Sequence, residues 1–269
     1  NGNYGTVSRK SVFGGDKMNG YIAFVKKEFM ENIKNYRFFI LFAVFLTFGI
    51  ASAFLAKFTP EILSALAADM EMNSEPVALD AWKQFYKNIS GVGFSAFIIL
   101  YGSCLSTEYS KGTLILMVTK GLSRKAVILA KFTVAAILMT LCYWVSYGAA
   151  YGYTAYLWDN TNLPDVAFAA FALWIAGFLY LSILMVGCVI FKQTFTSILF
   201  TGGIAALISL LGIIKPLVGL NPFILTTKNV DLISGMAAVS DFLIPALISI
   251  GISISGLLTA IWLFNRKQL

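Results

Sequence analysis

The chain has 269 residues, of which 58% are hydrophobic and 12% are charged. Soluble domains carry about 25% charged residues, so this composition indicates an integral membrane protein. The formal net charge of +7 could suggest nucleic-acid binding, but the basic residues flank apolar segments, where they suit an anionic membrane surface. The chain contains no histidine, which excludes imidazole metal sites and histidine-dependent catalytic triads.

The N-terminal segment, residues 1–37, is expected to form a cytoplasmic arm and an interfacial helix. Residues 1–17 are polar and glycine-rich, and are a native arm, sequence upstream of an alternative start at Met18, or sequence foreign to the natural protein. From residue 20 onward, apolar residues recur at helical spacing on one face: Ile22, Val25, Phe29, Ile33 and Tyr36. The opposite face carries Lys27, Glu31, Lys34 and Asn35. This pattern predicts an amphipathic helix that lies in the membrane interface.

Six uncharged segments follow, each long enough to cross a hydrocarbon core as a helix. They cover residues 38–56, 89–105, 132–155, 166–191, 193–214 and 242–264. The sequence therefore predicts an all-α polytopic membrane protein, with a six-helix transmembrane domain over residues 38–264 and a short cytoplasmic tail over 265–269. The three cysteines, Cys104, Cys142 and Cys188, fall within or at the ends of these segments without paired spacing, so we expect no disulfide.

Basic residues set the predicted orientation. Most of them precede the first span, lie between the second and third spans, or follow the last span. The other side holds only Lys57, Lys83, Lys87, Lys215 and Lys228. Because cytoplasmic loops are enriched in lysine and arginine, both termini are predicted to be cytoplasmic.

Two outer loops contain signals of their own. Thr59-Pro60-Glu61 has the form of a helix start, and Ile62, Leu66 and Met70 would share one face of a short outer helix. In residues 215–241, Lys215-Pro216 and Asn221-Pro222 predict two breaks. The apolar stretch 232–239 that follows is too short to span, so we expect it to lie at the outer surface or to enter the membrane partway.

The predicted spans contain no Asp, Glu, Lys or Arg, which argues against a proton-coupled carrier. Small residues suit close helix packing, within the bundle rather than between subunits: Gly148, Gly152, Gly202, Gly203, Gly251 and Ser255. The third span also holds a group of aromatic residues: Tyr143, Trp144, Tyr147, Tyr151 and Tyr153. These either contact cargo or, as we favour, anchor the span at the membrane interface.

The segment Glu108–Phe132 separates the second and third spans. It holds an apolar run of five residues, 114–118, which is too short to cross a membrane. Thr113 is a candidate N-cap, Gly121 a helix stop, and Ser123 a second N-cap. Basic residues would hold such a helix at the membrane surface: Lys111, Lys120, Arg124, Lys125 and Lys131. Its apolar face requires a partner.

This segment resembles the signature of ABC-2 type transporter permeases, the membrane subunits of ATP-driven exporters. The resemblance rests on Glu108-x-x-x-Gly112-Thr113-Leu114 and on the residues that follow, Leu116, Thr119, Ser123-Arg124 and Lys131. Gly121 departs from the proline that is common in the family, which suggests a looser turn. The interfacial helix, the six spans and the two long outer loops extend the resemblance to the whole chain.

The resemblance implies that residues 108–121 form a coupling helix, which sits in a groove of a separate cytoplasmic ATPase subunit. Glu108 and Gly112 would mark its entry, and Leu114, Ile115 and Met117 its buried contact. The alternative for Glu108 is a surface ion pair with Lys111 or Arg124. The full set of implied coupling residues is Glu108, Tyr109, Gly112, Thr113, Leu114, Ile115, Met117, Lys120, Ser123 and Arg124.

No P-loop motif occurs in the chain, so it is expected not to be an enzyme and to bind no cofactor itself. ATP and magnesium would be bound by the ATPase partner. The predicted function is export of an amphiphilic or hydrophobic substrate across a bacterial cell membrane, such as a bacitracin-like, lantibiotic or modulin-like peptide. A second permease copy, identical or different, would complete the transporter. The alternatives are an ATPase-independent carrier or channel and a membrane-embedded enzyme.

Overall fold

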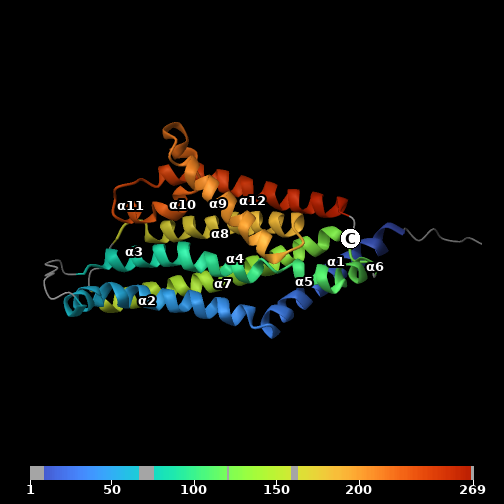
Figure 1. Ribbon diagram of the computed structural model, residues 1–269, viewed down its shortest axis with the longest axis horizontal. Helices are drawn as coiled ribbons and strands as arrows, with labels where there is room; N and C mark the ends of the chain where they lie inside the picture. The colour runs from blue at the N-terminus through green and yellow to red at the C-terminus, as the bar shows by residue number, and fades with distance from the viewer. Residues whose placement is uncertain (1–8, 67–75, 120, 159–162, 268–269) are drawn as a thin grey trace, which may run out of the picture.

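The computed structural model describes residues 9–66, 76–119, 121–158 and 163–267, and every regular element in these ranges is a helix (Figure 1). Among the helices of these ranges, six are long and apolar enough to cross a membrane, which confirms the predicted all-α polytopic fold. They cover Arg37–Thr59, Ala78–Lys111, Arg124–Leu157, Val166–Ile190, Thr194–Leu211 and Ser240–Arg266. Each contains or overlaps one predicted span.

The predicted interfacial helix is present as α1 (Arg9–Lys34). It is separated from α2 (Arg37–Leu66) by a break at Tyr36, whose φ of 57° lies in the left-handed region that a bulky side chain rarely adopts. Figure 1 shows α1 running obliquely to α2. On the apolar face that was predicted to lie in the membrane interface, Ile22 and Tyr36 are 58% and 69% exposed, so they do not pack into the bundle. The fully buried positions are Phe24, Glu28 and Asn32, a stripe at i, i+4 spacing that contains two polar residues.

The predicted helix start at Thr59 is wrong. Helix α2 continues from the first span through Thr59 to Leu66, and the Thr59 hydroxyl donates to the carbonyl of Leu55 within the same helix. A proline removes one helical hydrogen bond and can bend a helix without starting a new one. Met70, the last residue assigned to the predicted outer helix, lies outside the described residues.

The second span begins earlier than the sequence suggested. It consists of α3 (Ala78–Asn88), a π-helical turn (Ile89–Gly93) and α4 (Phe94–Tyr101). One face of α3 is buried through Trp82, Phe85 and Tyr86. Lys83 and Lys87 lie exposed on the same helix, and their charges obscured the apolar face in the sequence.

The bundle is built around α8 (Val166–Ile190), which packs against α7 (Arg124–Leu157), α9 (Thr194–Leu211) and α12 (Ser240–Arg266). Helix α9 is the least buried span. The small residues predicted to pack within the bundle do not do so, because a Cβ added at Gly148, Gly202 or Gly251 would meet nothing within 4 Å. The same holds for Gly152 and Gly203, and Ser255 is exposed.

Other glycines form the close helix contacts. A Cβ at Gly49 of α2 would lie 2.6 Å from the backbone oxygen of Ser146 in α7. A Cβ at Gly256 of α12 would lie 3.2 Å from the Ser182 hydroxyl in α8. Helical spacing shows which small residues share a face, but it does not show which face turns inward.

Both predicted breaks in the second outer loop are present. Lys215–Leu220 forms a 3₁₀ helix, and α10 (Ile224–Thr227) and α11 (Asn229–Ile233) follow Pro222. Both α10 and α11 pack against α8 and α3. Leu232 and Ile233 are buried, so the start of the apolar stretch 232–239 covers one end of the bundle.

The aromatic group of the third span divides between core and surface. Tyr143 is fully buried and donates to the carbonyl of Ala170 at 2.6 Å, so it is neither an exposed anchor nor a cargo contact. Tyr147 packs beside Trp82, with ring centroids 5.5 Å apart. Tyr151, at 53% exposed, is the member whose position fits an interface anchor. The three cysteines are buried and free.

Candidate coupling site at the basic end of the bundle

The segment between the second and third spans folds as two short helices. Helix α5 (Ser106–Lys111) ends at Gly112, α6 (Thr113–Thr119) follows, and Gly121 precedes α7. Gly112 and Gly121 have φ values of 65° and 92°, which favour glycine. The N–H of Leu122 donates to the carbonyl of Met117 at 3.2 Å, a bond typical of a glycine-terminated helix. The segment is therefore two short helices with a glycine at each end of α6.

We call the end of the bundle that carries α1, α5, α6 and the C-terminus the basic end (Figure 1).

Two predicted caps have different outcomes. Ser123 caps α7, since its hydroxyl accepts from the N–H of Ala126 at 3.3 Å. Thr113 is the first residue of α6 rather than its N-cap, and its hydroxyl donates to the carbonyl of Glu108 at 3.5 Å. Gly112 has open space around an added Cβ, so its left-handed conformation explains the glycine better than close packing does.

Glu108 is buried and ion-paired. Its Oε1 lies 3.1 Å from the ammonium group of Lys131 in α7 and 3.2 Å from that of Lys27 in α1. The alternative considered for Glu108, a surface ion pair with Lys111 or Arg124, is therefore wrong. That alternative assumed an exposed carboxylate, whereas Glu108 is buried and contacts Lys27 of α1 and Lys131 of α7. Glu108 also lies in the first turn of α5, where the helix dipole favours a negative charge.

Glu28 of α1 completes the arrangement. Lys131 contacts Glu28 Oε2 at 2.9 Å, and Lys27 contacts Glu28 Oε1 at 2.9 Å and Glu31 Oε2 at 2.7 Å. We call Lys27, Glu28, Glu31, Glu108 and Lys131 the charge cluster. It joins three elements that are far apart in the sequence: α1, α5 and α7.

The charge cluster is largely withdrawn from solvent. The side chains of Glu28, Glu108 and Lys131 are 7%, 6% and 4% exposed, whereas those of Lys27 and Glu31 are 41% and 37% exposed. Removing one partner of a buried pair leaves an uncompensated charge and destabilises a protein by about 3–5 kcal/mol. The buried members should therefore hold α1, α5 and α7 in fixed register.

The two half-buried members of the cluster stabilise each other's charged forms. Burial opposes the charge on Lys27, but hydrogen bonds to Glu31 and Glu28 outweigh it and raise the Lys27 pKa above its ordinary value. Burial likewise opposes the charge on Glu31, and the hydrogen bond from Lys27 outweighs it and lowers the Glu31 pKa. Both groups are therefore charged at neutral pH.

The cluster is an ion-pair network rather than a metal site. Carboxylate oxygens of Glu28, Glu31 and Glu108 lie within 4.8 Å of one another, a spacing that could suit a cation. However, the ammonium groups of Lys27 and Lys131 already contact these carboxylates at 2.7–3.2 Å. Two cations thus occupy the centre that a metal ion would need.

Tyr109 and Arg124 tie the same region to other helices. The ammonium groups of Lys192 and Lys267 lie 5.4 and 5.3 Å from the Tyr109 ring centroid, within cation–π range. Lys267 also donates to the carbonyls of Val189 and Ile190 at the C-terminal end of α8, at 2.6 and 3.0 Å. These bonds satisfy carbonyls that the helix leaves unpaired.

Arg124, which the resemblance places among the coupling residues, contacts the end of another helix. Its Nη1 donates to the carbonyls of Asn265 and Lys267, at 3.1 and 2.7 Å, at the C-terminal end of α12. A cation is favourable there because of the helix dipole. The first turn of α7 is therefore fastened to the last turn of α12.

The apolar residues of α6 are only partly available to a partner. Leu114 is 1% exposed and belongs to the hydrophobic core, so its apolar surface is already covered by this chain. Met117 is half-buried and packs against that core. The side chain of Ile115 and the whole of Lys120 lie outside the described residues.

Sequence reasoning missed Glu28 and the burial of Lys131. Lys131 was noted in the motif but was treated as a surface lysine. The available signal was the i, i+4, i+8 stripe of Phe24, Glu28 and Asn32, which places a carboxylate on the same face as a large aromatic residue. The partner of that carboxylate could not be identified from spacing alone.

A comparison with protein-family models matches residues 22–246 to "ABC-2 family transporter protein". The chain belongs to the ABC-2 transporter family. A search of curated proteins found no match. Membership identifies this ABC-2 chain as a multi-pass membrane permease subunit that works with a separate ATPase subunit. The match covers α2 to α11, the charge cluster and the beginning of α12.

Proposed function

We propose that this ABC-2 permease is the membrane subunit of an exporter and that residues 108–121 couple it to the ATPase. The observation that supports this most directly is the burial of Glu108 between Lys27 and Lys131. A surface loop without such contacts would deform when the ATPase displaced it, and the spans would not move. A loop fixed by buried ion pairs to α1 and α7 instead transmits displacement to both helices.

The arrangement suggests a mechanism. ATP and magnesium bind to the partner, whose closure displaces α5 and α6 together. The charge cluster carries this displacement to α1 and α7, and the Arg124 and Lys267 contacts carry it on to α12 and α8. Rigid-body movement of these helices then alters access to a cavity between two permease copies.

The positions of the chain ends support the proposed orientation. The first described residues of α1 and the end of α12 lie at the same end of the bundle as α5 and α6 (Figure 1). If the ATPase is cytoplasmic, both ends of the described chain are cytoplasmic too, in agreement with the distribution of lysine and arginine. We propose a bacterial cell membrane as the location.

The second permease copy is proposed to pack on an exposed span. Helix α9 is the least buried, and Gly202 and Gly203 on it leave open space for close approach of another helix. A homodimer is the simplest assembly, and a heterodimer would use the same surface. The spans as predicted from the sequence hold no charged residue and are rich in aromatic residues, which favours an amphiphilic or hydrophobic cargo such as a peptide, toxin or antibiotic.

Docking of the ATPase can be tested at Lys111, which is exposed at the end of α5. The permease carrying Lys111→Cys is labelled with a bulky maleimide and mixed with an ABC ATPase subunit from the same organism. The proposal predicts that labelling prevents co-purification of the ATPase. The matched control is Lys83→Cys, exposed on α3 at the opposite end, where the same label should have no effect.

Equal recovery of the ATPase with both labelled variants would contradict docking at residues 108–121. If no ATPase binds even the unlabelled permease, the ATPase-independent carrier or channel becomes the better hypothesis.

A further inference from the structure

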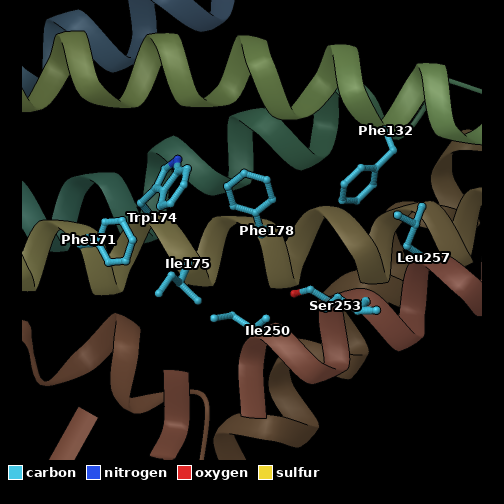
Figure 2. Close-up of a pocket in the computed structure, with 9 residues that line it drawn as sticks. Phe132, Phe171, Trp174, Ile175, Phe178, Ile250, Ser253 and Leu257 are labelled. Atoms are coloured by element: carbon cyan, nitrogen blue, oxygen red, sulfur yellow. The ribbon is translucent and has the colours of Figure 1, made fainter. Parts of the chain in front are cut away.

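A groove of about 320 Å³ opens between α7, α8 and α12 (Figure 2). Its wall includes Phe132 of α7, Trp174 and Phe178 of α8, and Ile250, Ser253 and Ile254 of α12. The residues on α8 and α12 lie near the middle of their spans, at the depth of the hydrocarbon core. Ile254 is 57% exposed, so the groove is open at the surface of the bundle.

The two polar groups that line the groove both use their donor hydrogens within the protein. The Ser253 hydroxyl donates to the carbonyl of Ser249 at 2.7 Å, and the Trp174 indole N–H donates to the hydroxyl of Thr140 at 3.1 Å. A peptide backbone in this groove would leave its N–H and C=O groups unpaired, which is unfavourable by several kcal/mol per group in hydrocarbon. An aliphatic chain carries no such groups.

The size of the groove also favours an aliphatic chain. Its volume equals about ten groups of the size of a water molecule, at ~30 Å³ each. Trp174 and Phe178 make edge-to-face contact, with centroids 4.9 Å apart, so the α8 wall is a packed aromatic surface.

A cation lies on the same helical face as the groove, toward the basic end. Lys125 is seven residues before Phe132 on α7, and Leu129 lies between them, so the three share one face. The rise between Lys125 and Phe132 is about 10 Å. Lys125 is exposed, and no carboxylate within the described ranges forms an ion pair with it. An anionic head group at Lys125 could therefore be joined to an acyl chain at Phe132.

We propose that the groove binds one acyl chain of an anionic phospholipid whose phosphate pairs with Lys125. The aromatic and aliphatic walls select a hydrocarbon chain, and the cation selects the head group. The lipid belongs to the leaflet at the basic end of the bundle. The bound acyl chain contacts all three spans and so supports their packing against one another.

Trp174 provides a direct readout. The permease is reconstituted in nanodiscs with phosphatidylglycerol or phosphatidylcholine brominated in the acyl chain, and fluorescence quenching is recorded. The contribution of Trp174 is the difference from the Trp174→Phe variant. We expect it to be half-quenched at an about fivefold lower mole fraction of phosphatidylglycerol, the factor that one lysine near a membrane surface supplies.

Two variants distinguish binding of the acyl chain from recognition of the lipid head group. Ser253→Phe fills the groove and should reduce quenching of Trp174 by both lipids. If that variant does not fold, Ile254→Trp combined with Trp174→Phe places the reporter at the rim instead. Lys125→Gln should leave quenching intact but remove the preference for phosphatidylglycerol. Lys26→Gln, the same change at an exposed lysine of α1, controls for the overall surface charge.

Three results would overturn the proposal. The first is quenching that rises in proportion to mole fraction equally for both lipids, which indicates bulk lipid contact. The second is no quenching of Trp174 at any fraction, which indicates that a second copy covers the groove. The third is an unchanged preference in Lys125→Gln. None of these measurements needs the ATPase, so their failure would leave the proposed coupling function untouched.

Discussion

Lys131→Met is the substitution that most clearly tests the charge cluster. Methionine fills much of the volume of lysine but removes the ammonium group that contacts Glu28 at 2.9 Å and Glu108 at 3.1 Å. Two carboxylates that are 7% and 6% exposed then keep only Lys27 as a partner. From the general cost of breaking a buried pair, we expect a loss of about 3–5 kcal/mol in the free energy of unfolding.

The assay is unfolding of the purified permease in one detergent, followed by tryptophan fluorescence. The matched control is Lys83→Met, which breaks the Asp80–Lys83 pair, whose side chains are 39% and 49% exposed. An exposed pair contributes about 0–1 kcal/mol. The double variant Lys131→Met with Glu28→Gln should regain part of the loss, because it also removes one uncompensated carboxylate. If Lys131→Met destabilises no more than Lys83→Met, the reasoning about the cluster is wrong.

Three further predictions concern the same region and the helix contacts. Because the Lys27 pKa is raised and the Glu31 pKa is lowered, their pair stabilises the fold fully between about pH 4.3 and 10.4, the ordinary pKa values of the two groups. This contribution is lost as pH falls through the lowered Glu31 pKa or rises through the raised Lys27 pKa. Glu31→Gln should therefore flatten the acid side of a plot of unfolding free energy against pH, and an unchanged plot would contradict the pairing. Gly112→Ala should destabilise the fold by about 1–2 kcal/mol, because Gly112 has a left-handed φ of 65°. In the same unfolding assay, Gly112→Asn should be milder and Gly219→Ala near neutral, and equal effects at both glycines would show that the left-handed backbone is not the cause. Gly49→Ala should destabilise the fold by about 1–3 kcal/mol because its new Cβ would meet Ser146, whereas Gly148→Ala, in open space, should be neutral or slightly stabilising. A larger loss of stability at Gly148 than at Gly49 would show that the α2–α7 contact is misplaced.

The spans could be predicted because their signals are local. A long apolar run bounded by charges identifies a membrane helix whatever its neighbours are. The second span shows the limit of using apolar runs. Lys83 and Lys87 interrupt the apolar run at α3, although the other face of that helix is buried through Trp82 and Phe85. The Thr59-Pro60 signature was overridden because α2 continues through it. A cap motif competes with helix continuation, and sequence alone does not decide the competition.

The candidate site was predicted only in part, for a different reason. Glu108, Gly112 and Ser123 belong to a local motif and could be found by resemblance. Glu28 lies on another helix, and its pairing with Lys131 depends on how α1 folds back onto α7. No spacing rule encodes that contact. The burial of Leu114 has the same origin, because the apolar face that seemed to need an external partner is partly covered by this chain.

The central claim is that Glu108 transmits movement from the ATPase to the spans through buried ion pairs. The most direct measurement is the amount of cargo moved per ATP hydrolysed by the reconstituted complex carrying Glu108→Gln, a change that keeps the shape of the side chain and removes its charge. We predict that ATP hydrolysis and ATPase binding persist while transport per ATP falls, and that Asp80→Asn, the equivalent change at an exposed pair, leaves the ratio unchanged. A Glu108→Gln complex that transports as much cargo per ATP as the unaltered complex would contradict the account.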